Sequence, residues 1–492
     1  MCEQNTKTEE RNMKKFTALF LALLMCMSLL SVGAFADEAP VTGTCGENVT
    51  WSLHNGQLDI RGTGPMDDIP NLGAEQNKLA QPWHDYASSI KFVSIGFGVT
   101  TVGNYAFFDC DSIEAVIINE GVTSIGVGSF SSCDKLYVLS IGGDVKSIGN
   151  VAFQSCTALT NVTVPDSVTF IDAHAFQNCT KLQNLTLSKN LENIKLETFA
   201  GCSSLETVTL PDSVKAIGMK AFDGCTKLAS INFPAGLESI GSYAFNECNA
   251  LKNITLGSNL KSVGHHAFED TGYYNDNKNW EGTKDDGILY IGEYLITSHS
   301  SEPEITVKDG TKIICEMAFD ELVNKFEYPN VNLESVIIPD SVTTIESLAF
   351  ADCRNLKSVA MGNGVATIGS SAFENCEKLA NVTIPESVTS IGYEAFGGCK
   401  ALSRAKFMGN APEVFEKDVF KNTASGFKIL APKDDSTWKG SAYNSFMRTW
   451  NGYSIEFYGD GGSSNPFSFI TDLLDSIMNI FRNLFSWLPF FG

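Results

Sequence analysis

Apolar and polar positions alternate along much of the chain in a unit that returns every 23 residues. In one such unit, Val162 and Val164 flank Thr163, and Asn161 comes before them. Successive side chains of a strand point to opposite faces, so this alternation predicts a short strand with one buried and one exposed face. Pro165 ends the strand, because proline has no N–H to donate to a neighbouring strand.

The rest of the unit predicts a second extended piece followed by a turn. Val168 and Ile171 are its apolar positions, and Ala175-Phe176 form a turn or a single helical turn that points one ring inward. One unit cannot bury its apolar face alone, so successive units are expected to stack. At the ~4.8 Å spacing of paired strands, their rows of Leu, Val, Ile and Phe would form a continuous core, each large side chain contributing ~1.5–3 kcal/mol.

The cysteines make the period visible. They recur at the same step in a run of seven and a run of three, namely Cys110, Cys133, Cys156, Cys179, Cys202, Cys225 and Cys248, then Cys353, Cys376 and Cys399. A fixed period of this length is the signature of a repeat architecture. The predicted fold class is a β-rich repeat solenoid over residues 91–423, with 23-residue coils, parallel strands and short helical turns.

These cysteines are predicted to be free thiols. Equivalent side chains on neighbouring coils point the same way, which keeps their Cβ atoms near the ~4.8 Å coil spacing rather than the ~3.8 Å typical of a disulfide. Buried, unpaired thiols are therefore expected.

The unit resembles the repeat of the BspA-like leucine-rich repeat family, which reads L-x-x-V-x-I-P, then V-x-x-I-G, then A-F-x-x-C. The matching positions here are Leu159, Val162, Val164, Pro165, Val168, Ile171, Ala175, Phe176 and Cys179. The resemblance implies an extracellular, right-handed curved solenoid whose parallel strands line one face. It also implies a bacterial surface protein of a class that binds matrix proteins or other cells, without naming a ligand.

The segments outside the repeat divide the chain further. Residues 1–12 are expected to be an upstream extension, 13–36 a signal peptide, 37–90 an N-terminal β cap, 424–458 a C-terminal cap and 459–466 a linker. The signal peptide is indicated by Lys14 and Lys15, an apolar run from residue 16 to 30, and the A-x-A cleavage pattern at residues 34–36. This leader predicts a secreted or cell-surface protein.

An insertion at residues 272–312 interrupts the repeats. Its aromatic residues, among them Tyr273, Tyr274 and Trp280, either bind a partner or cover the exposed solenoid core. Asn275, Asn277 and Asn279 place oxygen donors at alternate positions, as a calcium loop does, but Trp280 occupies the position where such a loop needs glycine. We therefore expect no metal site here.

Charge and motifs restrict the chemistry. The formal net charge is -22, so phosphate backbones would be repelled over most of the surface and nucleic acid is not an expected partner. None of the common hydrolase, metalloprotease or phosphate-binding motifs is present. The pair His265-His266 lies on a turn, where the repeat places no acidic partner, and we interpret it as solvated. No catalytic residue and no cofactor are expected.

The outward positions of the predicted strands form two uncharged rows. These candidate ligand-face residues are Asn161, Thr163, Asn184, Thr186, Thr207, Thr209, Ser230, Asn232, Asn253 and Thr255. Threonine suits exposed strands, so one interpretation is strand propensity alone. The other is a repeating hydrogen-bond surface for a glycan or an extended protein.

The last segment, residues 467–492, predicts an amphipathic helix. Apolar residues recur at steps of three and four and make a broad stripe, with members Phe467, Ile470, Leu474, Ile477, Phe481, Leu484, Trp487 and Leu488. The stripe is expected to lie on a membrane surface, to pair with another copy of the chain, or to dock on the solenoid.

The sequence thus predicts a non-catalytic, secreted or cell-surface scaffold for binding or adhesion, which recognises an extracellular protein or glycan through the solenoid surface. Two alternatives stay open. One is an enzyme whose catalytic residues lie on the insertion or the caps, and the other is a membrane-associated protein that acts through the C-terminal helix.

Overall fold

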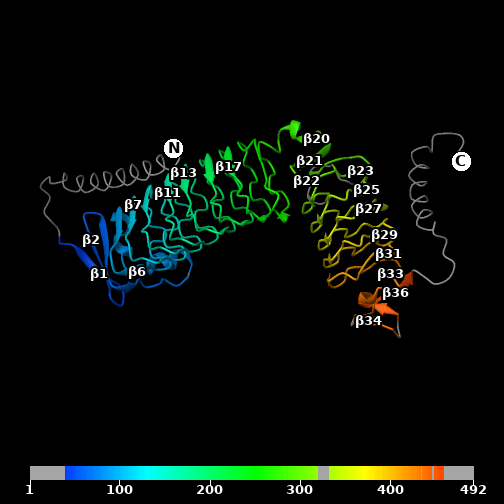
Figure 1. Ribbon diagram of the computed structural model, residues 1–492. Coiled ribbons are helices and arrows are strands. Elements are labelled where there is room, and N and C mark those ends of the chain that lie inside the picture. Colours follow the sequence, from blue (N-terminus) through cyan, green and yellow to red (C-terminus); the bar gives the residue numbers. More distant parts are fainter. Residues whose placement is uncertain are drawn as a thin grey trace, which may run out of the picture.

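The computed structural model describes residues 39–71, 73–284, 286–319, 332–433, 435–440, 442–445 and 448–458. This part of the chain is an elongated solenoid with β1 at one end and β36 at the other (Figure 1). The predicted leader, linker and amphipathic helix lie outside the described residues. The solenoid class, with parallel strands and 23-residue coils, is confirmed.

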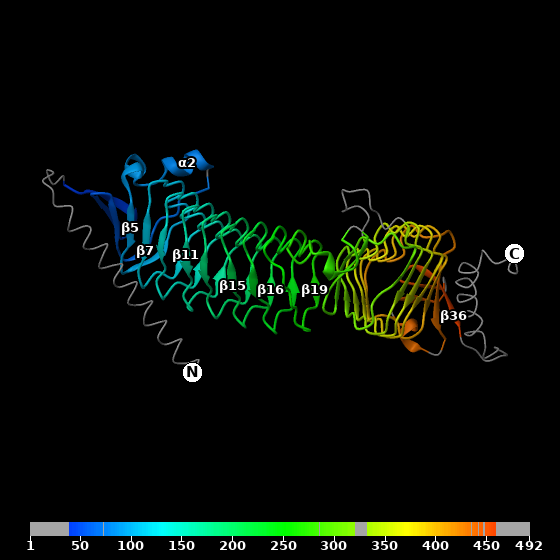
Figure 2. The same ribbon diagram turned by 90° about the horizontal axis from the view of Figure 1, so that it is seen from above.

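Each regular coil contributes one strand to each of two rows, as the view from above shows (Figure 2). The first row contains β5 (Phe92–Ile95), β7 (Ala115–Ile118), β9 (Val138–Ser140), β11 (Asn161–Thr163), β13 (Asn184–Thr186), β15 (Thr207–Thr209), β17 (Ser230–Asn232), β23 (Glu304–Thr306), β25 (Ser335–Ile338), β27 (Ser358–Met361), β29 (Asn381–Ile384), β31 (Arg404–Phe407), β33 (Lys428–Pro432) and β36 (Tyr453–Tyr458). We call its outward surface the strand face.

The second row contains β4 (Gly64–Pro65), β6 (Val99–Val102), β8 (Ser124–Ile125), β10 (Ser147–Ile148), β12 (Phe170–Ile171), β14 (Asn193–Ile194), β16 (Ala216–Ile217), β18 (Ser239–Ile240), β19 (Ser262–Val263), β24 (Ile313–Ile314), β26 (Thr344–Ile345), β28 (Thr367–Ile368), β30 (Ser390–Ile391) and β32 (Val414–Phe415). Pairing follows the repeat: Val162 lies opposite Leu185 in the first row, and Ile148 opposite Ile171 in the second. In-register pairing keeps the inward apolar residues of successive coils, such as Val162 and Ile171, on the core side.

The Ala-Phe segments are hydrogen-bonded turns rather than helical turns. Each places two residues in the left-handed region four positions apart, such as Val151 (φ 50°) and Ser155 (φ 57°). The backbone N–H of Phe153 then donates to the carbonyl of Ala175 in the next coil, with N to O at 2.8 Å. In a helical turn these donors would bond within their own coil, whereas here they add a third line of contacts along the stack.

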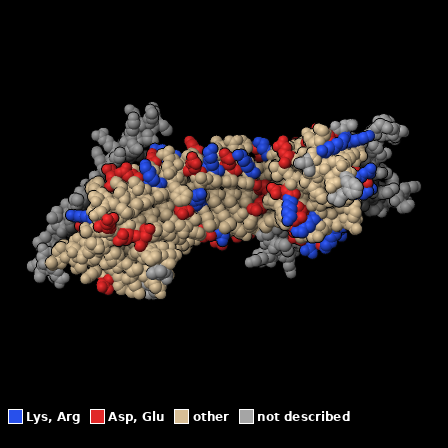
Figure 3. Space-filling view, turned by 90° about the horizontal axis from the view of Figure 1, so that it is seen from below, with Lys and Arg blue, Asp and Glu red and all other residues tan. Residues whose placement is uncertain are grey.

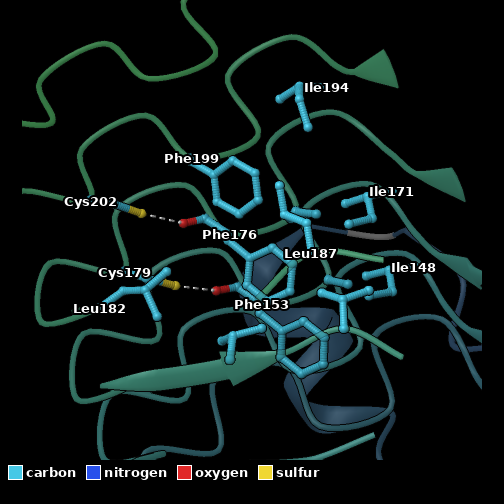
Figure 4. Packing of buried hydrophobic residues seen from close by; sticks show 14 of the residues in the cluster. Ile148, Phe153, Ile171, Phe176, Cys179, Leu182, Leu187, Ile194, Phe199 and Cys202 are labelled. Atoms are coloured by element: carbon cyan, nitrogen blue, oxygen red, sulfur yellow. Dashed lines mark hydrogen bonds between the residues drawn. The ribbon is translucent and has the colours of Figure 1, made fainter. Parts of the chain in front are cut away.

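Two columns of stacked phenylalanine rings form the centre of the core, part of which Figure 4 shows. The N-terminal column runs through Phe107, Phe130, Phe153, Phe176, Phe199, Phe222, Phe245 and Phe268, and the C-terminal column through Phe319, Phe350, Phe373, Phe396 and Phe420. Neighbouring rings such as Phe153 and Phe176 have centroids 5.3 Å apart and are fully buried.

The repeat cysteines are buried and free, as the geometry of stacked side chains predicts. The thiol of Cys179 donates to the carbonyl oxygen of Phe153 at 3.3 Å, and that of Cys202 to Phe176 at 3.3 Å (Figure 4). The acceptor lies 26 residues earlier in each case, so every such bond joins one coil to the one before it. The thiol thus satisfies a buried carbonyl lone pair instead of forming a disulfide.

The N-terminal end is closed by a small antiparallel unit. It consists of β1 (Val41–Gly46), β2 (Val49–His54), β3 (Gln57–Gly62), α2 (Ala74–Leu79) and η1 (His84–Ser89). β3 pairs in parallel with β5, so stacking begins before residue 91. Trp83 stacks on Phe107 with centroids 4.6 Å apart, and the side-chain oxygen of Gln81 accepts from Cys110 in place of a previous coil's carbonyl.

The C-terminal end continues the stack beyond residue 423. β33 pairs with β31 and β36 pairs with β33, while η4 (Ser436–Lys439), β34 (Tyr443–Asn444) and β35 (Thr449–Trp450) fold over the end. Phe427 and Tyr453 pack on Phe420, with ring centroids at 4.6 and 5.5 Å. The C-terminal column is therefore covered by Phe427, just before β33, and by Tyr453 of β36.

The insertion separates the two columns. It forms η2 (Asn277–Asn279), β20 (Trp280–Gly282), β21 (Gly287–Ile291) and β22 (Tyr294–Ser298), and β22 pairs in parallel with β24. Tyr274 and Trp280 are buried and join the N-terminal core. These two rings cover solenoid core, which agrees with the covering interpretation of the insertion.

Candidate binding face

The candidate face begins with side chains that the first row turns outward. Between Asn161 and Thr163, Val162 is 2% exposed, whereas both polar neighbours are exposed. In the next coil, Asn184 donates its side-chain N–H to the side-chain oxygen of Asn161 at 2.7 Å, and Thr186 lies opposite Thr163. Amides and hydroxyls thus form ordered rows that are spaced by the coil repeat.

The predicted face residues are all exposed, but their polar atoms are not used in the same way. Thr207, Thr209 and Ser230 are exposed on β15 and β17. Asn232 instead turns to the backbone of Leu210: its side-chain oxygen accepts from the N–H at 2.7 Å and its amide donates to the carbonyl at 3.0 Å. Its polar atoms are used to join coils, so Asn232 is a poor candidate for ligand binding.

Asn253 and Thr255 depart from the prediction in another way. Both are exposed, but the segment around them is not a regular strand. The insertion follows this coil, and the next first-row strand, β23, pairs with β25 only. The coil therefore lacks the stacked neighbour that would extend the ladder.

The same rows continue beyond the insertion, where the repeat pattern also predicts outward positions. Asn381 and Thr383 are exposed on β29. One coil further, Arg404 lies opposite Asn381 and Lys406 opposite Thr383, and Lys428 then lies opposite Arg404. Counting 23 residues onward from Asn381 reaches Arg404, so the period itself could have revealed the change from neutral to cationic side chains.

The second row carries a line of charged side chains that alternate in sign from coil to coil. Its members are Glu192, Lys215, Glu238, Lys261, Glu293 and Lys312. Glu238 lies 3.8 Å from Lys215 and 2.7 Å from Lys261, and the hydrogen bond from Lys261 lowers the pKa of its carboxyl. These charges neutralise one another along the stack.

The repeats that build both rows match a family model, that of the BspA type leucine-rich repeat region. Six copies match, over residues 84–206, 169–284 and 321–447. The chain belongs to the BspA-type leucine-rich repeat family. The three ranges cover more than half of it, so the expectation from the repeat motif is confirmed.

Several solved structures resemble this BspA-type protein. A leucine-rich repeat protein from Bacteroides ovatus is 20% identical over 87% of this chain and 100% of its own, with a TM-score of 0.41. One from Eubacterium ventriosum is 23% identical over 73% of this chain and 95% of its own (TM-score 0.36). A leucine rich cell surface protein from Faecalibacterium prausnitzii is 21% identical over 86% and 96% (TM-score 0.30). No curated protein matches the chain.

The BspA-type stack is interrupted where the insertion enters after β19. Val263 is the last residue of its sheet, and its N–H donates to the buried carboxyl of Glu346 at 3.2 Å. The same oxygen of Glu346 accepts from the N–H of Glu316 at 3.0 Å. Burial raises the pKa of Glu346 to about 8. At the joint between the two columns, the carboxyl of Glu346 therefore accepts backbone hydrogen bonds that a neighbouring strand would otherwise accept.

The histidine pair lies at the same joint, and its interpretation as solvated was wrong. His265 Nδ1 lies 3.2 Å from Glu316, and His266 Nδ1 lies 2.8 Å from Glu269. The hydrogen bond from His265 lowers the pKa of Glu316. The partner of His265 comes from beyond the insertion, 51 residues away, and a scan of one repeat unit could not reveal it.

Neither thiols nor metal chemistry define a site in the BspA-type coils. Burial raises the pKa of Cys202 to about 12, so at neutral pH this thiol is protonated and unreactive. Within the described ranges, no group of three or more His, Cys, Asp and Glu side chains could hold a metal ion. The described helices are also all too short or too polar to cross a membrane.

Proposed function

We propose that this chain is a secreted or cell-surface, non-catalytic scaffold for binding or adhesion, which recognises an extracellular protein or glycan through its strand face. The supporting observation is the ordered rows of exposed amides and hydroxyls at Asn161, Asn184, Thr163 and Thr186. Strand propensity alone would account for threonine. It does not require asparagine, which strands generally disfavour.

The rows suit recognition of a long ligand better than catalysis. They repeat at the coil spacing along paired strands, which offers many equivalent hydrogen bonds from uncharged side chains. A glycan or an extended protein segment would bind by adding weak contacts along the rows. The leader at residues 13–36 is the basis for placing this activity outside the cell.

The test uses the full chain on an array of glycans and matrix proteins. Aspartate introduced together at Thr163, Thr186 and Thr209 should abolish capture of the ligand, because three buried carboxylates at the contact would lack partners. The control places aspartate at Thr100, Thr123 and Thr169, which are exposed along the second row. Unchanged capture by the first variant would exclude the neutral rows around Thr163, Thr186 and Thr209 as the binding site.

The apolar tail supports a further part of the proposal, retention at the cell envelope or by self-association. A stripe such as Phe467, Ile470 and Leu474 is unfavourable in water unless something covers it. Deleting residues 466–492 should release soluble monomer into the medium while the melting transition of the repeats stays nearly intact. A large loss of repeat stability would mean that the tail docks on the solenoid.

A further inference from the structure

Three cations lie together at the C-terminal end of the strand face. Arg404 and Lys428 are directly opposite each other on β31 and β33, and Lys406 projects from the same side of β31, two residues beyond Arg404. Arg404 is exposed, and Lys428 keeps 44% of its side chain in solvent. On the face that Figure 3 presents, Lys and Arg are also more frequent toward this end, whereas Asp and Glu predominate at the other.

This arrangement differs from the ion pairs that join coils elsewhere. Those pairs place opposite charges beside each other, as in Glu334 with Lys357 (2.7 Å) or Lys261 with Glu238 (2.7 Å). Like charges directly opposite on paired strands are destabilising. The pair Arg404 and Lys428 therefore costs stability in a fold that could have placed a carboxylate at either position.

The positive charge of the three cations is only partly neutralised by neighbouring groups. Lys428 pairs with Glu456, and Lys406 lies over the ring of Tyr458, 5.1 Å from its centroid. Lys428 lowers the pKa of Glu456 most, and Arg404 adds a weaker effect. Among the described residues, Glu456 forms the one ion pair of the cluster, with Lys428, and no ion pair forms at Arg404. The cluster has an excess of positive charge on a protein whose net charge is -22.

The surroundings of the cluster indicate the kind of ligand. Its polar neighbours on the face are Asn381, Thr383 and Ser403, which offer hydrogen bonds. The apolar neighbours are single side chains, Leu430 opposite Lys406 and the ring of Tyr458 beneath it. Stable protein interfaces are centred on buried aromatic or aliphatic anchors. A polysaccharide with acidic groups needs only hydrogen bonds and charge, and the planar guanidinium of Arg404 fits a carboxylate or sulfate through two parallel bonds.

We propose that Arg404, Lys406 and Lys428 bind an acidic polysaccharide, one bearing carboxylate or sulfate groups, whose chain continues along the strand face over Asn381 and Thr383. This inference rests on the proposed function and names one ligand class for it. The acidic groups lie against the cationic cluster, and the sugar hydroxyls against the amide and hydroxyl rows. Binding weakens as salt is added, because the attraction is largely ionic.

The experiment measures the affinity of the full chain for polygalacturonate and for dextran sulfate, with neutral dextran beside them. The double variant Arg404→Gln, Lys406→Gln should weaken binding of at least one acidic polymer about tenfold or more. The matched control is Lys357→Gln, Lys400→Gln, which removes two lysines already paired with Glu334 and Glu377. The control should stay within about twofold of wild type, and circular dichroism should show both variants folded.

Three results would overturn the inference: equal weakening by the control, absence of binding to both acidic polymers, and binding of polyglutamate or duplex DNA as tightly as the polysaccharide. The last result would assign the cluster to acidic chains in general. Loss of array capture in the aspartate variant at Thr163, combined with no polysaccharide binding, would reject the inference and leave the proposed function standing. If the triple aspartate variant still captures its ligand on the array, and the double variant Arg404→Gln, Lys406→Gln loses polysaccharide binding, the neutral rows are rejected as the site and the cationic cluster is supported.

Discussion

The N-terminal and C-terminal columns are built from the same repeat, yet they present different surfaces. Inside, both stack phenylalanine rings in parallel, with centroids 5.3 Å apart for Phe153 and Phe176 and 5.1 Å for Phe350 and Phe373. Outside, the first row is neutral at Asn161 and cationic at Arg404. Packing restricts the inward positions, whereas the outward positions are free to vary.

The comparison separates two kinds of information in a repeat. An inward residue must fit the coils above and below it, so the period fixes its type along the column. An outward residue needs only to be compatible with strand conformation, so its side-chain type can be selected for what the surface binds. A change in the outward row while the inward row stays constant is therefore a better indicator of function than any feature of the core.

The largest predicted effect lies in the cores and tests whether the columns are separate. Phe176→Ala should cost about 3–5 kcal/mol, because it leaves a cavity in a fully buried stack. Phe373→Ala should cost as much in the other column. Amide hydrogen exchange should show the loss in the mutated column alone. Equal loss of protection in both columns would mean that the solenoid unfolds as one unit.

A smaller effect is expected at the joint. Glu346→Leu should cost about 1–3 kcal/mol, since the N–H of Val263 loses its acceptor and the N–H of Glu316 keeps only the carbonyl of Val263 at 3.4 Å. Glu346→Gln keeps an acceptor oxygen and should be milder. The pKa of Glu346 rises from 4.5 to about 8 on folding.

The raised pKa gives the joint a pH dependence with a definite sign. Between about pH 4.5 and 8 the folded state binds more protons than the unfolded state, so the stabilisation from Glu346 falls as the pH rises. Urea titrations of wild type and Glu346→Gln should converge or cross across this window. A constant stability difference between them would show that Glu346 does not titrate there.

The thiol bonds between coils should contribute less. Cys179→Ala removes a bond to the carbonyl of Phe153 and should cost about 1 kcal/mol, while Cys179→Ser keeps a donor and should cost less. The thiols of the native protein should resist alkylation at pH 8, and denatured, unreduced protein should label fully. Almost no labelling after denaturation would mean that the repeat cysteines form disulfides.

The smallest effect is expected in the alternating charge row. Glu238→Lys would place three lysines in sequence, with Lys215 and Lys261 on either side. These side chains are exposed, so the change should lower the melting temperature slightly in low salt and not at all in 1 M salt. A large, salt-independent loss would indicate a role in packing.

Much of the fold could be predicted from local pattern because the determinants recur. In each coil, the residue equivalent to Val162 marks the first-row strand and the one equivalent to Ile171 marks the second-row strand. The equivalents of Phe176 and Cys179 mark the turn and the buried thiol. The turn type was left open, since the left-handed residues at these sites include Val151, whose type does not favour that conformation.

The site was predicted less completely, because it depends on neighbours outside one unit. Asn232 has the right type and position, yet its side chain bonds to the backbone of Leu210 in the coil before. His265 meets Glu316 only because the insertion folds between them. The period indicates cationic side chains at Arg404 and Lys406, but only the structure places Lys428 and Glu456 beside Arg404 and shows the excess of positive charge.

The most direct test of ligand binding through the strand face is the structure of the full chain in complex with the ligand it captures best on the array. The account predicts that ligand atoms lie within hydrogen-bond distance of outward side chains on at least three consecutive first-row strands. The contacted side chains belong either to the rows at Asn161 and Thr163 or to the continuation of these rows at Asn381 and Arg404. A ligand held on the insertion at residues 272–312, or against the Ala-Phe turns, would contradict it.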